Sequence, residues 1–139
     1  MATLLVVEDD RPTHALFVAL VNRCGCEASS AFDGRAALRK VRGERPDGMI
    51  LDLLLPEMNG VELLEEIDRF APQLISRTIV ITAASDSLFH DCAQMRYVRC
   101  LMRKPFNIEE LESDLMLMLD GRPAEQKVRA GGPMRLKIS

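Results

Sequence analysis

The sequence predicts an α/β fold, a doubly wound five-stranded parallel sheet with strand order 2-1-3-4-5. Strand and helix signals alternate from one end of the chain to the other, which is typical of a parallel sheet covered by helices on both faces. The clearest strand candidates are continuous apolar runs, as expected for strands buried on both sides. Five strands and five helices fit into residues 1–119 of the 139-residue chain, so we expect a single domain there.

The first two strands and helices occupy the N-terminal third of the chain. Residues 4–7 are an unbroken apolar run, and Pro12 suits the first turn of the next helix because the missing N–H of proline costs nothing there. A weaker strand is predicted around residues 26–29, and Asp33 then opens a second helix that Gly43 is expected to end. The apolar stripe expected on the first helix consists of Ala15, Leu16, Ala19 and Leu20.

The middle of the chain supplies the third strand, the third helix and the fourth strand. Residues 46–52 are predicted to be the third strand, and residues 56–60 the turn that follows it. Asn59 can cap the next helix through its side-chain oxygen. Residues 78–82 form the fourth strand, because they are rich in β-branched side chains.

The remaining elements are a fourth helix, a short strand and a last helix. The fourth helix is expected to begin at Asp86 or Ser87, and the fifth strand covers about residues 100–103. Asn107, with Glu110 three residues later, forms a capping-box-like start for the last helix. The apolar positions expected on the fourth helix are Leu88, Cys92 and Met95, and those on the last helix are Ile108, Leu111, Leu115 and Met118.

Charge, apolar runs and cysteines narrow the classes of function. The net charge of −3 is uneven, because residues 120–139 carry +3 and the rest of the chain −6. An acidic body argues against binding to nucleic acid, and no apolar run approaches the roughly 18 residues that cross a membrane. The four cysteines lack the spacing of a zinc site, so we expect reduced thiols in a cytoplasmic protein. Residues 120–139 are predicted to be a flexible basic C-terminal tail.

Polar residues follow the predicted strands where each one ends. Glu8 and Asp9 come after the first strand, Asp52 ends the third, Thr82 ends the fourth and Lys104 follows the fifth. Carboxyl ends of parallel strands share one edge, so we expect these side chains to meet there. Neighbouring carboxylates repel unless a cation lies among them, and an all-oxygen ligand set favours Mg²⁺. With the metal in place, an Asp52 oxygen could attack phosphorus, while the Thr82 hydroxyl and the Lys104 ammonium hold phosphoryl oxygens.

These motifs resemble those of a response-regulator receiver domain of a two-component phosphorelay. The resemblance is carried, in order and at receiver spacing, by LLVVEDD, PDGMILDLLLPEMNG, IVITA and RKPF. It covers residues 1 to about 119 and implies the flavodoxin-like receiver fold, here expected as a stand-alone module without an output domain. The four motifs together are far more specific than any one of them.

The resemblance assigns a role to each residue of the predicted site. It implies that Asp52 is the phosphoacceptor and that Asp9 is a direct Mg²⁺ ligand, with Glu8 acting through water. The backbone carbonyl of Leu54 would complete the metal site. The phosphoryl group would come from a histidine of a sensor histidine kinase or of a histidine phosphotransfer protein. The domain would catalyse only its own phosphorylation and dephosphorylation, and would act on a downstream protein target.

One position departs from the family pattern. Receivers usually place Tyr or Phe three residues before the lysine, and here that position is Leu101. We therefore expect phosphorylation chemistry to survive, with weaker or altered coupling to the surface of the fourth helix, fifth strand and fifth helix. That surface is also the candidate face for a homodimer.

Two other functions remain open. A receiver-like scaffold that works without phosphorylation is kept open by Leu101, although the complete acidic and phosphoryl-binding set argues against it. An aspartate-based phosphohydrolase would need a general acid two residues after the nucleophile, where Leu54 stands.

Several other residues receive a structural interpretation. Asp10 serves equally well as a helix cap or a site residue, and both histidines, His14 and His90, are expected at the surface. Tyr97 should be partly exposed. Two further apolar residues, Met116 and Leu117, form either a patch for a partner or a surface covered by the basic tail.

Overall fold

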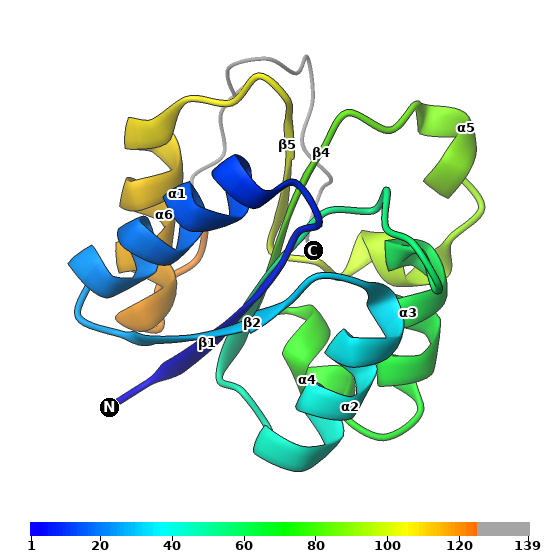
Figure 1. The fold of residues 1–139 in the computed structure, drawn as a ribbon, viewed down its shortest axis with the longest axis horizontal. Helices are drawn as coiled ribbons and strands as arrows, with labels where there is room; N and C mark the ends of the chain where they lie inside the picture. Colours follow the sequence, from blue (N-terminus) through cyan, green and yellow to red (C-terminus); the bar gives the residue numbers. More distant parts are fainter. Residues whose placement is uncertain (125–139) are drawn as a thin grey trace.

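The computed structural model describes residues 1–124, in which five parallel strands form a single sheet (Figure 1). The strand order is β2-β1-β3-β4-β5, as the sequence predicted. The strands are β1 (Thr3–Val7), β2 (Glu27–Ala31), β3 (Gly48–Leu51), β4 (Thr78–Thr82) and β5 (Cys100–Arg103). Residues 125–139, most of the expected basic tail, lie outside the described residues.

Helices cover both faces of this sheet. They are α1 (Arg11–Arg23), α2 (Gly34–Glu44), α3 (Gly60–Asp68), α4 (Pro72–Ile75), α5 (Asp86–Phe89), the 3₁₀ helix η1 (Ala93–Arg96) and α6 (Ile108–Leu119). Figure 1 shows α1 and α6 together on one side of the sheet, with α2, α3 and α4 on the other. No helix within residues 1–124 is long and apolar enough to span a bilayer.

Strand alternation divides the apolar side chains between two cores. Leu4 and Val6 of β1 face α1 and α6, whereas Leu5 and Val7 face α2 and α3. All four side chains are fully buried, as expected for a central strand of a parallel sheet. The sheet is therefore sandwiched between two apolar layers, and polar chemistry is confined to its edges.

The ends of three predicted elements shift. β2 covers Glu27–Ala31 instead of residues 26–29, and β3 is shorter than residues 46–52. Residue 47 precedes β3 and bonds Thr3 through both its amide and its carboxylate, with Asp47 N to Thr3 O at 2.8 Å. α2 runs through Gly43 and ends at the left-handed Arg45 (φ 51°), since the following Pro46 disfavours helical backbone at that position.

The predicted fourth helix is not continuous. Its start is correct, but α5 ends at Phe89 and η1 begins only at Ala93. Residues 90–92 are His, Asp and Cys, all weak helix formers, which explains why apolar spacing alone overestimated the helix. Cys92 and Met95 are nonetheless buried, as their spacing predicted.

The last helix follows its prediction with one exception. Asn107 caps α6 by accepting a hydrogen bond from Glu110 N at 2.9 Å. The predicted positions Leu111, Leu115 and Met118 are buried, whereas Ile108 in the first turn is 44% exposed.

Candidate functional site

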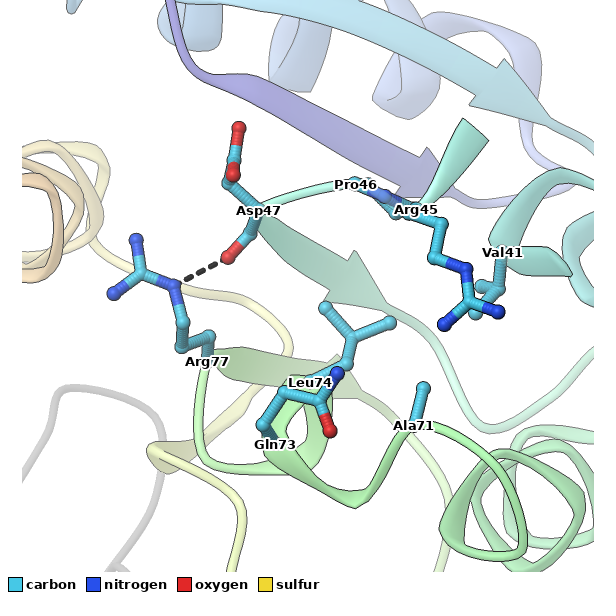
Figure 2. A pocket seen from close by; sticks show the side chains of 8 residues that line it. All are labelled: Val41, Arg45, Pro46, Asp47, Ala71, Gln73, Leu74 and Arg77. Carbon is cyan, nitrogen blue, oxygen red and sulfur yellow. Dashed lines mark hydrogen bonds between the residues drawn. The ribbon is translucent and has the colours of Figure 1, made fainter. Parts of the chain in front are cut away.

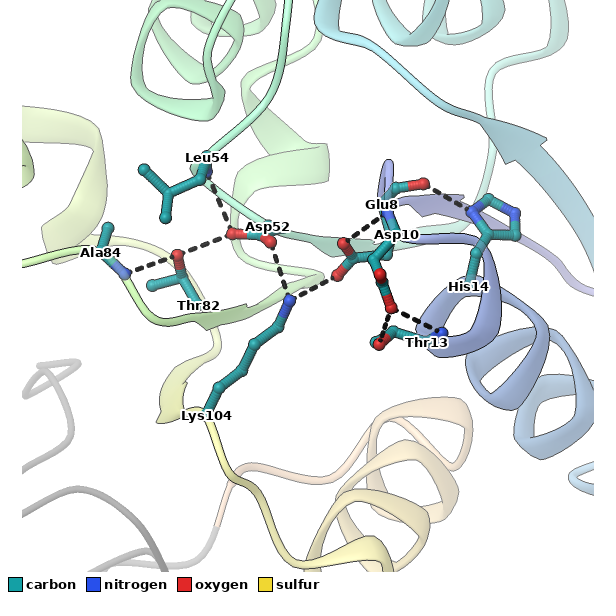
Figure 3. Close-up of polar contacts among 9 residues, drawn as sticks. All are labelled: Glu8, Asp10, Thr13, His14, Asp52, Leu54, Thr82, Ala84 and Lys104. Carbon is teal, nitrogen blue, oxygen red and sulfur yellow. Dashed lines mark hydrogen bonds and ion pairs between the residues drawn. The ribbon is translucent and has the colours of Figure 1, made fainter.

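The carboxyl edge of the sheet brings together the side chains that the sequence singled out. Glu8 follows β1, Asp52 follows β3, Thr82 ends β4 and Lys104 follows β5 (Figure 3). β3 pairs with both β1 and β4, so the acid after it has one polar neighbour on each side. The order of the strands thus explains why residues up to 96 positions apart in the chain meet at one place.

Three carboxylates form an acidic group. Ligand oxygens of Glu8, Asp9 and Asp52 all lie within 4.8 Å of one another. Glu8 and Asp52 are buried, whereas Asp9 is exposed, and within residues 1–124 no group donates a hydrogen bond to the Asp9 carboxylate. Three closely spaced carboxylates, one with free ligand positions toward solvent, suit a hard cation that keeps part of its water shell. The donor set therefore fits Mg²⁺.

Lys104 compensates the two buried acids. Its Nζ donates to Glu8 Oε1 at 2.8 Å and to Asp52 Oδ2 at 2.9 Å. Burial would lower the pKa of Lys104, but the hydrogen bonds to both carboxylates and their charges outweigh it, so that this pKa is raised. Burial raises the pKa of Glu8, against the opposing effects of Lys104 and of the Asp10 amide. The ammonium thus stays charged and holds the two acids together.

The other oxygen of Asp52 is held by two donors. Thr82 Oγ1 donates to Asp52 Oδ1 at 2.7 Å, and the Leu54 amide donates to the same oxygen at 3.0 Å. The Ala84 amide donates in turn to Thr82 Oγ1 at 3.1 Å, which directs the hydroxyl proton toward Asp52 (Figure 3). Each Asp52 oxygen therefore already contacts a donor that could serve an incoming phosphoryl group.

Leu54 and Asp10 lie beside the site. Leu54 presents an apolar side chain, 49% exposed, next to Asp52, and the role of its carbonyl as a metal ligand stays a prediction. Asp10 is the N-cap of α1 and accepts a hydrogen bond from Thr13 N at 3.1 Å. Hydrogen bonds from the Thr13 side chain and backbone lower the pKa of Asp10. Asp10 thus acts as a helix cap in the described structure.

The predicted surface position of His14 is wrong. Its side chain is buried, with Nδ1 2.9 Å from Glu8 O and Nε2 2.8 Å from Ser30 Oγ. The ring stacks on Phe32 with the centroids 4.2 Å apart, and burial is the main cause that lowers the pKa of His14. The buried face of α1 is His14, Phe17, Leu20 and Val21. Of the predicted stripe Leu20 is buried and Leu16 is half-buried against the core, whereas Ala15 and Ala19 are exposed.

His14 supports the backbone of the acidic group, a role that the sequence did not suggest. Through its bond to the Glu8 carbonyl it fixes the backbone that presents the acidic pair. Its burial could have been predicted from its position three residues before Phe17, because residues at that spacing lie on the same face of a helix. The other histidine, His90, is exposed, as predicted.

The switch position is buried, and Tyr97 near it is exposed, as predicted. Leu101 is buried and packs in the core beneath α5 and η1. Tyr97 is 61% exposed, so its ring offers no replacement inside the core. Met116 is half exposed on α6, which agrees with either interpretation of that surface.

A separate pocket lies at the opposite edge of the sheet (Figure 2). Its volume is about 230 Å³, and Asp47 and Arg77, which precede β3 and β4, lie on its wall. Because the strands are parallel, their amino ends are a full strand length from the acidic group. The pocket therefore has no part in the chemistry of the site.

Comparison with known proteins agrees with the fold and identifies the family. The family model described as "Response regulator receiver domain" matches residues 4–116. The probable transcriptional regulatory protein TcrX of Mycobacterium tuberculosis is 33% identical over 123 residues, which cover 84% of this chain and 49% of TcrX. The chain spans about half the length of the first curated relatives it matches.

Solved structures agree as well. A CheY-like receiver domain protein from Methanospirillum hungatei superposes with a TM-score of 0.77 at 23% identity, over 87% of this chain and 95% of that one. The response regulator TrrA from Thermotoga maritima, solved in complex with Mg²⁺-BeF, has a TM-score of 0.70 and 28% identity, over 81% and 95% of the two chains. The chain belongs to the response regulator receiver domains of two-component signalling.

Proposed function

We propose that Asp52 accepts a phosphoryl group in a Mg²⁺-dependent reaction and that this modification controls binding to a downstream protein. The observation that carries the proposal is the set of contacts around one carboxylate. Thr82 and Leu54 donate to Asp52 Oδ1, Lys104 donates to Oδ2, and two further acids complete a cation site. A buried carboxylate needs hydrogen-bond donors in any case, so what distinguishes Asp52 from a structural aspartate is the adjoining group of acids, which is open to solvent at Asp9.

The reaction needs the groups of this edge, bound Mg²⁺ and a phosphoryl donor. One Asp52 oxygen attacks phosphorus and forms an acyl phosphate, while the bond from phosphorus to the donor's imidazole nitrogen breaks. The Thr82 hydroxyl and the Lys104 ammonium then turn from the carboxylate to phosphoryl oxygens. Both donors are already within 2.9 Å of Asp52, so little rearrangement is required.

The cation site would be formed by Asp9 and Asp52 directly, by Glu8 through water and by the Leu54 carbonyl. Bound Mg²⁺ would offset the repulsion between the carboxylates and a phosphoryl oxygen. Lys104 already occupies the space between Glu8 and Asp52, so the exposed Asp9 carboxylate is the natural first contact for an entering ion.

We further propose the partners that this chemistry requires. The donor would be a phosphohistidine on a sensor histidine kinase or on a histidine phosphotransfer protein, and the reaction would take place in the cytoplasm. Receiver domains of this family act as signalling modules, so the domain would change only its own phosphorylation state and thereby its affinity for a target. A homodimer through the α5, β5 and α6 face belongs to the same proposal.

Acetyl phosphate provides the direct test of Asp52. With Mg²⁺ present we expect one phosphate per chain by intact mass, labile to hydroxylamine, and none in Asp52→Asn. The matched control is Asp91→Asn, because Asp91 is an exposed aspartate outside the site and its replacement should leave the adduct unchanged.

The outcomes separate the candidate functions. No adduct on folded wild type, from acetyl phosphate or from a phosphohistidine donor, would contradict the proposal and favour the phosphorylation-independent scaffold. Rapid release of many phosphates per chain would instead favour a phosphohydrolase. The apolar Leu54 side chain beside Asp52 has no proton to donate, so we expect slow release.

A further inference from the structure

Arg103, the last residue of β5, connects the edge of the sheet to α5. Its Nη1 donates to the Ala84 carbonyl, and its Nη2 forms an ion pair with Asp86 at the start of α5. The guanidinium also lies over the Phe89 ring, with Cζ 5.2 Å from the ring centroid. One side chain thus contacts the segment after β4 and both ends of α5.

The same segment is hydrogen-bonded to the candidate phosphoacceptor. The Ala84 amide donates to Thr82 Oγ1, and Thr82 Oγ1 donates to Asp52 Oδ1. Ala84 therefore uses its N–H toward the site and its C=O toward Arg103. A continuous series of polar contacts runs from Asp52 through Thr82 and Ala84 to Arg103 and α5.

Leu101 lies under this series on the same face of β5, two residues before Arg103. It is buried against Val80 of the neighbouring strand and belongs to the core that contains Phe89. Leu101 lacks the aromatic ring that Tyr or Phe would supply at this position. A response of α5 to a change at Asp52 would therefore use other contacts.

We infer that Arg103 is a positioning residue that transmits the phosphorylation state of Asp52 to α5, an inference that rests on the proposed function. When the Thr82 hydroxyl turns to a phosphoryl oxygen, Thr82 Oγ1 shifts and the Ala84 peptide group follows it or loses its bond. Arg103 holds the carbonyl of the same residue, in the next peptide group along the chain, and also contacts Asp86 and Phe89, so a movement of Ala84 shifts α5 as well. The contacts of Arg103 thus provide differential interactions in the two states, which any ligand-driven change requires.

The test compares amide NMR spectra of the 139-residue chain with and without Mg²⁺ and beryllofluoride, a mimic of the phosphoryl group. In wild type we expect shifts at Thr82, at Ala84 and throughout α5. In Arg103→Ala the shift at Thr82 should persist, while the shifts in α5 should fall roughly twofold or more. Arg103→Lys keeps one cationic donor and should restore part of the response.

A control and a second variant separate transmission from folding. Arg69→Ala removes an arginine whose described contact is a 3.7 Å ion pair with Glu66 on the surface, and should leave the α5 response intact. Phe89→Leu keeps the core volume close to native but removes the ring under the guanidinium, and should reduce the response even if Arg103→Ala unfolds.

Each result has one meaning. Shifts in α5 that are equal in wild type, Arg103→Ala and Phe89→Leu, with Thr82 responding in all three, would overturn the role of Arg103 and leave the proposed function standing. Absence of any response at Thr82 in folded wild type would instead contradict the proposed function itself.

Discussion

At the scale of single residues, the site depends on polar groups that are buried with partners already in place. Glu8 and Asp52 are 1% and 4% exposed, and burying a lone carboxylate to that degree would be costly. Hydrogen bonds from Lys104 and Thr82 offset the cost of burying these carboxylates. The same two donors are the groups that phosphoryl transfer needs. His14 adds a neutral buried group that holds the Glu8 backbone.

The free energy of unfolding should depend on pH partly through the protonation of His14. Its folded pKa lies below the ordinary value near 6.5, so between these two values the unfolded chain binds more protons than the folded one. Its contribution is therefore fully present above about pH 6.5 and is lost as the pH falls through the folded pKa. Urea unfolding at about pH 7.5 and about pH 5.5 should show a smaller difference in His14→Gln than in wild type.

The other histidine provides the control for this measurement. His90 is exposed, so His90→Gln should keep the wild-type difference between the two pH values. Equal differences in all three proteins would mean that His14 does not titrate with folding, and that carboxylates alone cause the pH dependence.

At the scale of elements, the start of α3 fixes the segment that carries Asp52. Asn59 and Glu62 form a capping box, with Glu62 N to Asn59 Oδ1 at 2.9 Å and Asn59 N to Glu62 Oε1 at 3.0 Å. Gly60 begins the helix directly against the strand end, and its amide donates to Leu53 O at 2.9 Å. The helix start and the loop after β3 are therefore one rigid unit.

Replacing each of two glycines by alanine should distinguish the effect of helix propensity from the effect of the close contact between Gly60 and the loop after β3. A Cβ at Gly60 would lie 2.7 Å from Leu53 Cα and 2.9 Å from Asp52 O, so Gly60→Ala must displace backbone beside the acceptor. We expect a loss of about 1–3 kcal/mol in the free energy of unfolding and slower phosphorylation by acetyl phosphate.

Gly43→Ala is the matched control, because nothing lies within 4 Å of a Cβ at that helical position. It should stabilise the protein by up to about 1 kcal/mol and leave the phosphorylation rate unchanged. Urea denaturation and intact-mass time courses of both variants check the pair. If Gly60→Ala behaved like Gly43→Ala, the loop after β3 would be more adaptable than its contacts indicate.

At the scale of the whole molecule, the parallel sheet collects charge at one edge and leaves both faces apolar. The acidic group lies between β1 and β3, and the cation Lys104 reaches it from β5 across β4. An ion bound there would contact residues from two strands, so its binding is linked to the folded state. Binding of this kind raises the stability of the whole domain.

Mg²⁺ should therefore increase the free energy of unfolding, by about 2.7 kcal/mol at a concentration 100 times its dissociation constant. Asp9→Asn should remove most of this increase, and because Asp9 is exposed the variant should fold. Asp91→Asn should keep the full increase, since that exposed aspartate lies outside the acidic group. Urea unfolding across a Mg²⁺ titration measures all three, and an unchanged increase in Asp9→Asn would exclude Asp9 as a ligand.

The sequence by itself determined the strand order and the set of residues at the carboxyl edge. Alternating apolar runs and helix signals define a parallel doubly wound sheet, and that topology places Glu8, Asp52, Thr82 and Lys104 together whatever the details of packing. These features follow from local patterns and chain order.

Only the tertiary structure decided which polar side chains are buried and what they touch. His14 and Arg103 look like surface residues in the sequence, yet one holds the Glu8 carbonyl and the other joins Ala84 to α5. The break between α5 and η1 also became visible only in the structure: weak helix formers at residues 90–92 permit it, and the core buries Cys92 and Met95 without a continuous helix. Apolar periodicity reports which face is buried, whereas hydrogen-bond partners distant in sequence are set by packing.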